Sequence, residues 1–272
     1  MGVRVVKLKI VNVLPIGPQS RGRQVWNMTA IRTALWLAIL GTASGPALAG
    51  PPFVTDDPTP TDYRHFENYL YSAGTKAHDG VNGAAGLDLN YGAAPNLQLT
   101  AALPVEYDHS RNSGTLGGLG NIELAAKYRF LHQEEIGWDV AIFPRVFFPS
   151  PSAHVGERHA SFLFPVWIGR SFGKWSTFGG GGYIIHRGGD AKDFAIAGWA
   201  LTRQVTPHLQ LGVELFHQTA DTKGGDATTG IGAGLLYDLS ENLHVLAYVG
   251  SGIQNAAPTN EVSWYASLLF TF

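Results

Sequence analysis

The end of the sequence decides the fold, because residues Val262 to Phe272 read Val-Ser-Trp-Tyr-Ala-Ser-Leu-Leu-Phe-Thr-Phe. Counted back from the last residue, every second side chain is apolar: Phe272, Phe270, Leu268, Ala266, Trp264 and Val262. The side chains between them are mostly polar. A period of two is typical of a β-strand with two unlike faces, so the sequence predicts a final strand with one apolar side.

A last strand with one apolar face and a terminal Phe resembles the carboxy-terminal signal of bacterial outer-membrane β-barrels. The resemblance implies that Trp264, Leu268, Phe270 and Phe272 form an assembly signal. It also implies two partners, outer-membrane lipid and the barrel-assembly machinery. We therefore expect the protein to lie in the bacterial outer membrane.

The start of the sequence predicts export. An apolar run over residues 34–41 follows Arg32 and precedes the small-residue site Ala47-Leu48-Ala49. This is the pattern of a cleaved secretory signal peptide, and the run is too short for a spanning helix. We interpret Met28 as the natural start and residues 1–27 as an upstream extension. The alternative is a long basic region of one signal peptide. In both cases residues 1–49 are expected to be removed.

Removal of that segment changes the charge of the chain. It takes six of the 19 basic residues and none of the 21 acidic ones, which leaves 13 basic against 21 acidic side chains, a net charge of −8. An acidic mature chain argues against nucleic acid as a partner. The absence of cysteine excludes disulfides and thiolate zinc sites. The 34 glycines and many aromatics suit a lipid-facing barrel.

Alternating apolar and polar residues predict twelve strands in residues 63–272, a single barrel domain. Their expected ranges are 63–73, 82–92, 97–107, 120–130, 137–148, 159–170, 175–186, 192–203, 208–218, 228–238, 243–253 and 260–272. Each is long enough to cross a bilayer as a tilted strand. The connections alternate between short and long, with long ones expected at 74–81, 108–119 and 149–158, among others. This alternation fits an all-β transmembrane antiparallel barrel with both termini in the periplasm.

The apolar face of each strand is expected to face lipid. In residues 122–130, Ile122, Leu124 and Tyr128 alternate with Glu123, Lys127 and Arg129. Sequence alternation alone does not distinguish this barrel from a soluble one with its apolar face inside. The signal peptide and the terminal Phe favour the membrane arrangement, in which the sheet must close.

With the apolar faces outside, charged side chains of both signs line the lumen. The predicted pore-lining residues are Asp88, Glu106, Glu123, Lys127, Arg129, Asp139, Arg145, Glu214 and Glu261. They could form a constriction that selects solutes, or an ion-pair network that fills the interior and stiffens the wall. A barrel of eight strands is filled by its own side chains and one of sixteen encloses a channel, so twelve strands leave both alternatives open.

A short leader, residues 50–62, precedes the first predicted strand. It is rich in Pro and Asp and cannot be a regular strand, so it either stays flexible or enters the periplasmic mouth. The sequence predicts no catalytic residues, no metal ligands and no cofactor. His109, His154 and His159 lack metal-binding spacing, and no Gly-x-Ser-x-Gly elbow exists.

Several segments are similar to the transporter-like outer-membrane family labelled "MetA-pathway of phenol degradation". They are Pro52-Phe53-Val54-Thr55-Asp56-Asp57-Pro58, Asn96-Leu97-Gln98-Leu99 with Pro104, residues 118–130, Phe143-Pro144 and Thr229-Gly230. The resemblance implies a barrel that takes up small, aromatic or hydrophobic, solutes, and it brings no catalytic residues. The alternatives are a structural or adhesive barrel with an occluded lumen, and an outer-membrane lipid hydrolase.

Overall fold

A computed structural model describes residues 52–110, 114–150, 159–187 and 191–272. The predicted signal peptide, its cleavage site and His154 lie outside these residues. The strands are β1 (Phe66–Ala77), β2 (Gly80–Ala94), β3 (Leu97–Ser110), β4 (Gly114–Leu119), β5 (Ile122–Leu131), β6 (Asp139–Ile142), β7 (Arg145–Phe148), β8 (Ser161–Phe172), β9 (Trp175–Ile185), β10 (Phe194–Thr206), β11 (Leu209–Gln218), β12 (Thr228–Asp238), β13 (Leu243–Gln254) and β14 (Val262–Thr271). Two single-turn helices, α1 (Gln133–Ile136) and α2 (Ala256–Thr259), lie between strands.

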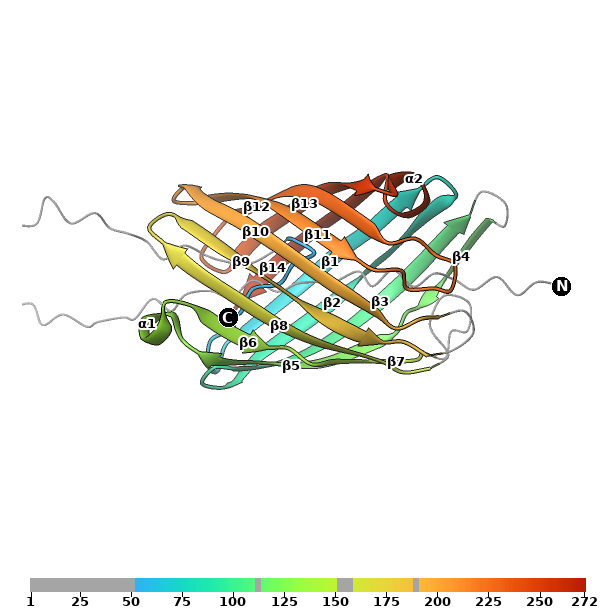
Figure 1. The fold of residues 1–272 in the computed structure, drawn as a ribbon. Coiled ribbons are helices and arrows are strands. Elements are labelled where there is room, and N and C mark those ends of the chain that lie inside the picture. Colours follow the sequence, from blue (N-terminus) through green and yellow to red (C-terminus); the bar gives the residue numbers. More distant parts are fainter. Residues whose placement is uncertain (1–51, 111–113, 151–158, 188–190) are drawn as a thin grey trace, which may run out of the picture.

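The fourteen strand segments form a closed antiparallel barrel of twelve transmembrane strands (Figure 1). β3 pairs with both β4 and β5, so these two segments are one strand interrupted at Gly120-Asn121. β8 likewise pairs with both β6 and β7, which Phe143-Pro144 separates. Proline has no N–H to donate to a neighbouring strand, which accounts for the second interruption. The barrel closes where β1 pairs with β14, from Glu67 opposite Thr271 to Lys76 opposite Val262.

The predicted twelve-stranded barrel is confirmed, and every predicted strand overlaps an observed one. The prediction of a long connection at 74–81 is wrong, because β1 and β2 stay paired as far as Ala77 and Gly80. Thr75, Lys76 and Asn82 gave this stretch the polarity of a loop, but they extend a hairpin beyond the membrane. The connection expected at 108–119 is shorter for the same reason, since Ser110 still pairs with Gly114.

The apolar faces of the strands point outward, as predicted. On β3, Val105 is 57% exposed, whereas Gln98 on the opposite face is 1% exposed. Leu124, Tyr128, Val213 and Val249 are exposed on other strands. An apolar outer surface that covers the whole wall is stable only in contact with lipid. The barrel therefore lies in the bacterial outer membrane, with its short turns and both ends of the barrel chain on the periplasmic side.

The assembly-signal residues belong to this outer face. Phe270 and Leu268 are exposed on β14, and Trp264 covers the bare backbone of Gly74. Phe272 stacks on Phe66 with ring centroids 5.4 Å apart. Their recognition by assembly machinery stays a prediction. In the part of the chain that the structure describes, neither helix has the length and apolar character to span a membrane.

Candidate functional site

The leader fills the lumen of the barrel. In Figure 1 the segment from Pro52 to β1 runs inside the wall, and in it Phe53, Thr55, Asp56 and Asp57 are at most 2% exposed. Its prolines keep it out of the sheet. It joins the wall near the periplasmic end, where Tyr63 bridges to Gly92. The leader thus enters far deeper than the periplasmic mouth, and its described residues occupy the interior of the barrel.

The tip of the leader packs on glycine in the barrel wall. The Phe53 ring lies 6.1 Å from that of Phe178 and 5.9 Å from that of Tyr248, between centroids. It covers Gly212 and Gly234, where an added Cβ would lie 2.6 Å and 3.1 Å from ring atoms of Phe53. A side chain at either position would project into the lumen, so a larger residue there would exclude the Phe53 ring.

Glu214 holds the same part of the leader through its main chain. Its carboxylate accepts hydrogen bonds from the N–H of Val54, at 3.1 Å, and from the N–H of Thr55. Thr55 lies against Gly198 on the neighbouring strand, which has no side chain to obstruct it. A carboxylate that accepts two N–H bonds fixes the backbone of the leader as well as its side chains.

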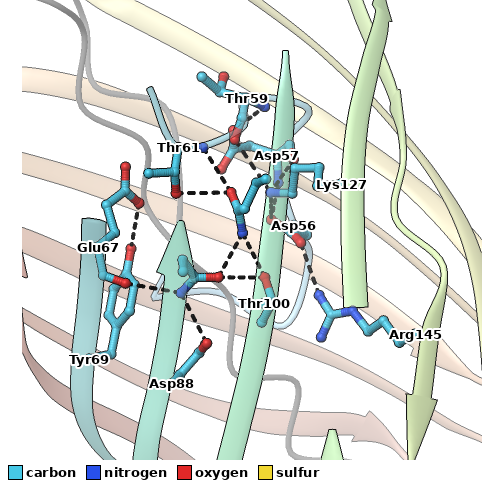
Figure 2. Close-up of polar contacts among 12 residues, drawn as sticks. Asp56, Asp57, Thr59, Thr61, Glu67, Tyr69, Asp88, Thr100, Lys127 and Arg145 are labelled. Carbon is cyan, nitrogen blue, oxygen red and sulfur yellow. Dashed lines mark hydrogen bonds and ion pairs between the residues drawn. The ribbon is translucent and has the colours of Figure 1, made fainter. Parts of the chain in front are cut away.

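Asp56 is clamped between two cations of the wall. Its Oδ1 lies 2.9 Å from Lys127 Nζ, and its Oδ2 lies 3.0 Å from Arg145 Nη2. The three side chains are at most 1% exposed. Arg145 also pairs with Glu123 at 3.3 Å. Both cations stack on Phe143, with Lys127 Nζ 4.8 Å and Arg145 Cζ 4.1 Å from the ring centroid. Asp56, Lys127 and Arg145 form a buried ionic clamp on the leader, and Figure 2 shows these three side chains.

The carboxylate next to the clamp is held by the main chain. Asp57 Oδ1 accepts a hydrogen bond of 2.7 Å from the N–H of Thr59. The Asp57 carbonyl accepts a second hydrogen bond, of 3.0 Å, from Lys127 Nζ. Burial raises the pKa of the Asp57 carboxyl to about 7, with nearby Lys127 acting in the opposite direction.

A chain of amides and hydroxyls holds the base of the leader (Figure 2). The N–H of Thr61 donates to Gln98 Oε1 at 2.8 Å, and Gln98 Nε2 donates to Asn90 Oδ1 at 2.7 Å. Asn90 Nδ2 in turn donates to Asp88 Oδ1 at 3.0 Å. Thr100 Oγ1 completes the chain with a bond to Asn90. The leader is therefore bound at its tip, its middle and its base.

The predicted pore-lining residues fall into two groups. Asp88, Glu123, Lys127, Arg145 and Glu214 are buried in the barrel, and three of them contact the leader directly.

The other four lie away from the clamp. Arg129 pairs with Asp139 at 3.5 Å beside α1 at the periplasmic end, and Glu261 pairs with Lys76 at 3.3 Å at the opposite end. The Glu106 side chain lies over Gly120. The lining of a conducting pore by these nine residues stays a prediction.

Sequence reasoning missed Asp56 and Glu67. Asp56 is the centre of the clamp, but it stands in a segment without periodicity. Glu67 is fully buried on β1 and accepts a hydrogen bond of 3.3 Å from the Tyr69 hydroxyl. The alternation on β1 could have found Glu67, since it shares the inward face with Tyr69 and Tyr71.

Solved barrels share this architecture at low sequence identity. The COG4313 outer membrane channel from Pseudomonas putida F1 is 14% identical, with 82% of this chain and 100% of that chain covered and a TM-score of 0.67. The KdgM porin is 10% identical, with 76% and 98% covered and a TM-score of 0.50. The β domain of the Bordetella autotransporter BrkA is 14% identical, with 77% and 99% covered and the same TM-score. These likenesses show the fold.

Two comparisons of the sequence complete the assignment. No curated protein matches it. A family model matches residues 59–270, which include the base of the leader and nearly all of the barrel. The chain therefore belongs to the outer-membrane barrel family described as "Putative MetA-pathway of phenol degradation".

Proposed function

We propose that the protein is an outer-membrane channel for small hydrophobic or aromatic solutes, closed at mid-depth by its own leader. One observation carries the proposal: the lumen is filled by a separate chain segment rather than by side chains of the wall. A wall that filled its own interior would need no such segment. Removal of the leader would leave the glycine surfaces at Gly198, Gly212 and Gly234 facing an open space.

The lining of that space suits a solute with a ring. Phe178, Tyr248 and Phe143 point inward beside the leader, and Phe53 demonstrates that an aromatic ring fits between the first two. Aromatic side chains pair with other rings at centroid distances of about 4.5–7 Å. The family description, which mentions phenol, agrees with this solute class.

The charged side chains are proposed to line the opened lumen. Lys127, Arg145, Glu123 and Asp88 would then face water, and charges of both signs would set the ion selectivity. The predicted constriction and the predicted ion-pair network are thus two states of one site, with the leader bound in the second.

The test is removal of residues 52–60 and measurement of single-channel conductance and solute entry into liposomes. The shortened barrel should conduct more than the full protein and admit small aromatic alcohols faster. Heat-modifiable gel mobility must first show that the variant is folded.

A structural or adhesive barrel with an occluded lumen is the second candidate, and the buried clamp favours it. A folded, shortened barrel that conducts no better than the full protein would establish that candidate instead. No observation among the described residues favours a lipid hydrolase.

A further inference from the structure

A recess lies above the leader on the extracellular side of the lumen. It contains about 970 Å³ of empty space, which includes open solvent at its mouth. Val54 and Thr55 of the leader form its floor. Its walls come from β1, β8, β10, β11, β12 and β14, and its rim from the connection 219–227 and α2. We call this recess the vestibule.

Buried polar atoms in the vestibule have no hydrogen-bond partner among the described residues. They are Trp167 Nε1, Thr228 Oγ1 and Asn260 Oδ1. Trp167 is 2% exposed and Asn260 is 4% exposed, so neither side chain reaches bulk solvent. An unmet buried donor or acceptor is costly, and such groups are normally satisfied by water or a ligand. One indole donor, one amide acceptor and one hydroxyl therefore belong to residues that line a space that a small molecule can enter.

The wall beside these atoms is apolar. Trp167, Ile196 and Phe216 are buried side chains that line the vestibule, and Val54 adds to its floor. Phe216 lies against Gly230, which leaves the face of the wall around it smooth. A pocket with apolar walls and a few polar atoms suits a small molecule with one apolar and one polar end. A ring fits such walls better than a flexible chain, because it loses less conformational freedom on binding.

The charge of the vestibule limits the polar end of that molecule. Asp221 and Asp226 line it, together with His217, and no Lys or Arg is among the described residues that line it. Asp221 Oδ2 also accepts a hydrogen bond of 3.3 Å from Gln218 Nε2, which keeps this carboxylate at the rim. Carboxylates in a partly enclosed space attract cations and repel anions.

We propose that the vestibule binds small aromatic compounds that carry an uncharged or positively charged hydrogen-bonding group, and that it rejects aromatic carboxylates. The apolar wall holds the ring, the unmet polar atoms hold the polar group, and the two aspartates select against negative charge. The inference deepens the proposed function and rests on it only for transport: the site would load solute from outside before the leader moves.

The test compares three probes that share one ring and differ in the polar group: benzyl alcohol, benzylamine and benzoate. Calorimetric titration of the full-length folded barrel should detect binding of the alcohol and the amine, with benzoate at least tenfold weaker. Thr228→Trp, which fills the vestibule, should remove the signal and so corrects for partition into detergent. Equal binding of benzoate, or no binding of any probe, would overturn the proposal.

Two variants separate the roles of the vestibule residues. Asp221→Asn with Asp226→Asn should weaken benzylamine and strengthen benzoate, while benzyl alcohol binds as before. Asp108→Asn is the matched control, since it lies at the same end of the barrel but does not line the vestibule. Trp167→Phe keeps a ring and removes the N–H donor, so it should weaken benzyl alcohol severalfold and leave benzylamine, whose ammonium group cannot accept a hydrogen bond, bound as before. Unchanged binding in both variants would show that the probes bind elsewhere.

Binding of the probes is measured independently of conductance. Probe binding without flux through the shortened barrel would refute the channel and retain the site. Flux without probe binding would retain the channel and refute the site.

Discussion

Replacement of Asp56 by Asn should release the leader. The substitution keeps the shape of the side chain and removes the negative charge between Lys127 and Arg145, at 2.9 Å and 3.0 Å. Removal of one partner from a buried ion pair costs about 3–5 kcal/mol, because the remaining charge is left without compensation. When the leader leaves, both cations regain water, so that cost falls on the docked state alone.

The magnitude follows from the same figures. A difference of about 1.4 kcal/mol changes an equilibrium constant tenfold, so about 3–5 kcal/mol raises the ratio of released to docked leader by roughly two to three and a half orders of magnitude. The amide oxygen of Asn still accepts one hydrogen bond, which places the expectation toward the lower end. Glu123 stays paired with Arg145 and compensates part of its charge, which lowers the expected cost further.

Single-channel recording and limited proteolysis measure this release. Asp56→Asn should raise the time-averaged conductance and expose the leader to protease, and Asp79→Asn in the exposed β1–β2 turn is the matched control. Lys127→Gln added to Asp56→Asn should restore part of the docking, since it removes the uncompensated cation. A leader that stays protected in Asp56→Asn, in a folded barrel, would refute the argument that uncompensated charge on Lys127 and Arg145 drives its release.

Four further outcomes are expected. Phe53→Ala should weaken docking by about 3–5 kcal/mol, because that is the usual cost of removing a buried Phe. The leader should then be digested faster by protease. Unchanged digestion would show that Phe53 does not hold the leader. The pKa of Asp57 is raised from 3.8 to about 7 in the docked leader, so docking takes up a proton: it is strongest below about pH 4 and weakens as pH rises through 7, and conductance should rise over the same range. Constant conductance from about pH 5 to pH 8 would contradict this. In the barrel without its leader, neutralising Lys127 and Arg129 should shift selectivity toward cations, measured as reversal potential, because carboxylates then dominate; an unchanged potential would place both residues away from the narrowest point. Deletion of Phe272 should lower the yield of heat-modifiable protein in the outer membrane, and an equal yield would count against the assembly signal.

The fold could be predicted from the sequence because its signal is local. Alternation along each strand gives both the strand and its lipid face, and Leu124 and Lys127 on opposite faces of β5 follow this rule. The error at residues 74–81 also has a local cause. Hairpins that extend past the membrane no longer need apolar residues, so Thr75 and Asn82 pair in register with loop-like polarity.

Only the wall residues of the site could be predicted from the sequence. Alternation placed Lys127 and Arg145 inside the barrel, but their shared partner Asp56 lies 71 and 89 residues away in a segment without periodicity. No pattern in the leader indicates which wall charges it meets. The vestibule depends on the same docking, because Thr55 forms its floor only when the leader is inside.

The chemistry of the clamp fits a segment that has to leave. A leader held by apolar contacts alone would expose all of that surface to water on release, and nothing would offset the loss. Asp56, Lys127 and Arg145 instead give up hydration on docking, and on release they recover it. Their attraction in the docked state and their hydration in the released state nearly cancel, so the ionic clamp fixes the register of the leader and adds little to its affinity. Phe53 then supplies most of the affinity, through one ring on two glycines. Under the proposed function, a solute ring that enters from the vestibule competes for the surface that Phe53 covers, and release of that single ring would free the clamp to hydrate and the lumen to open.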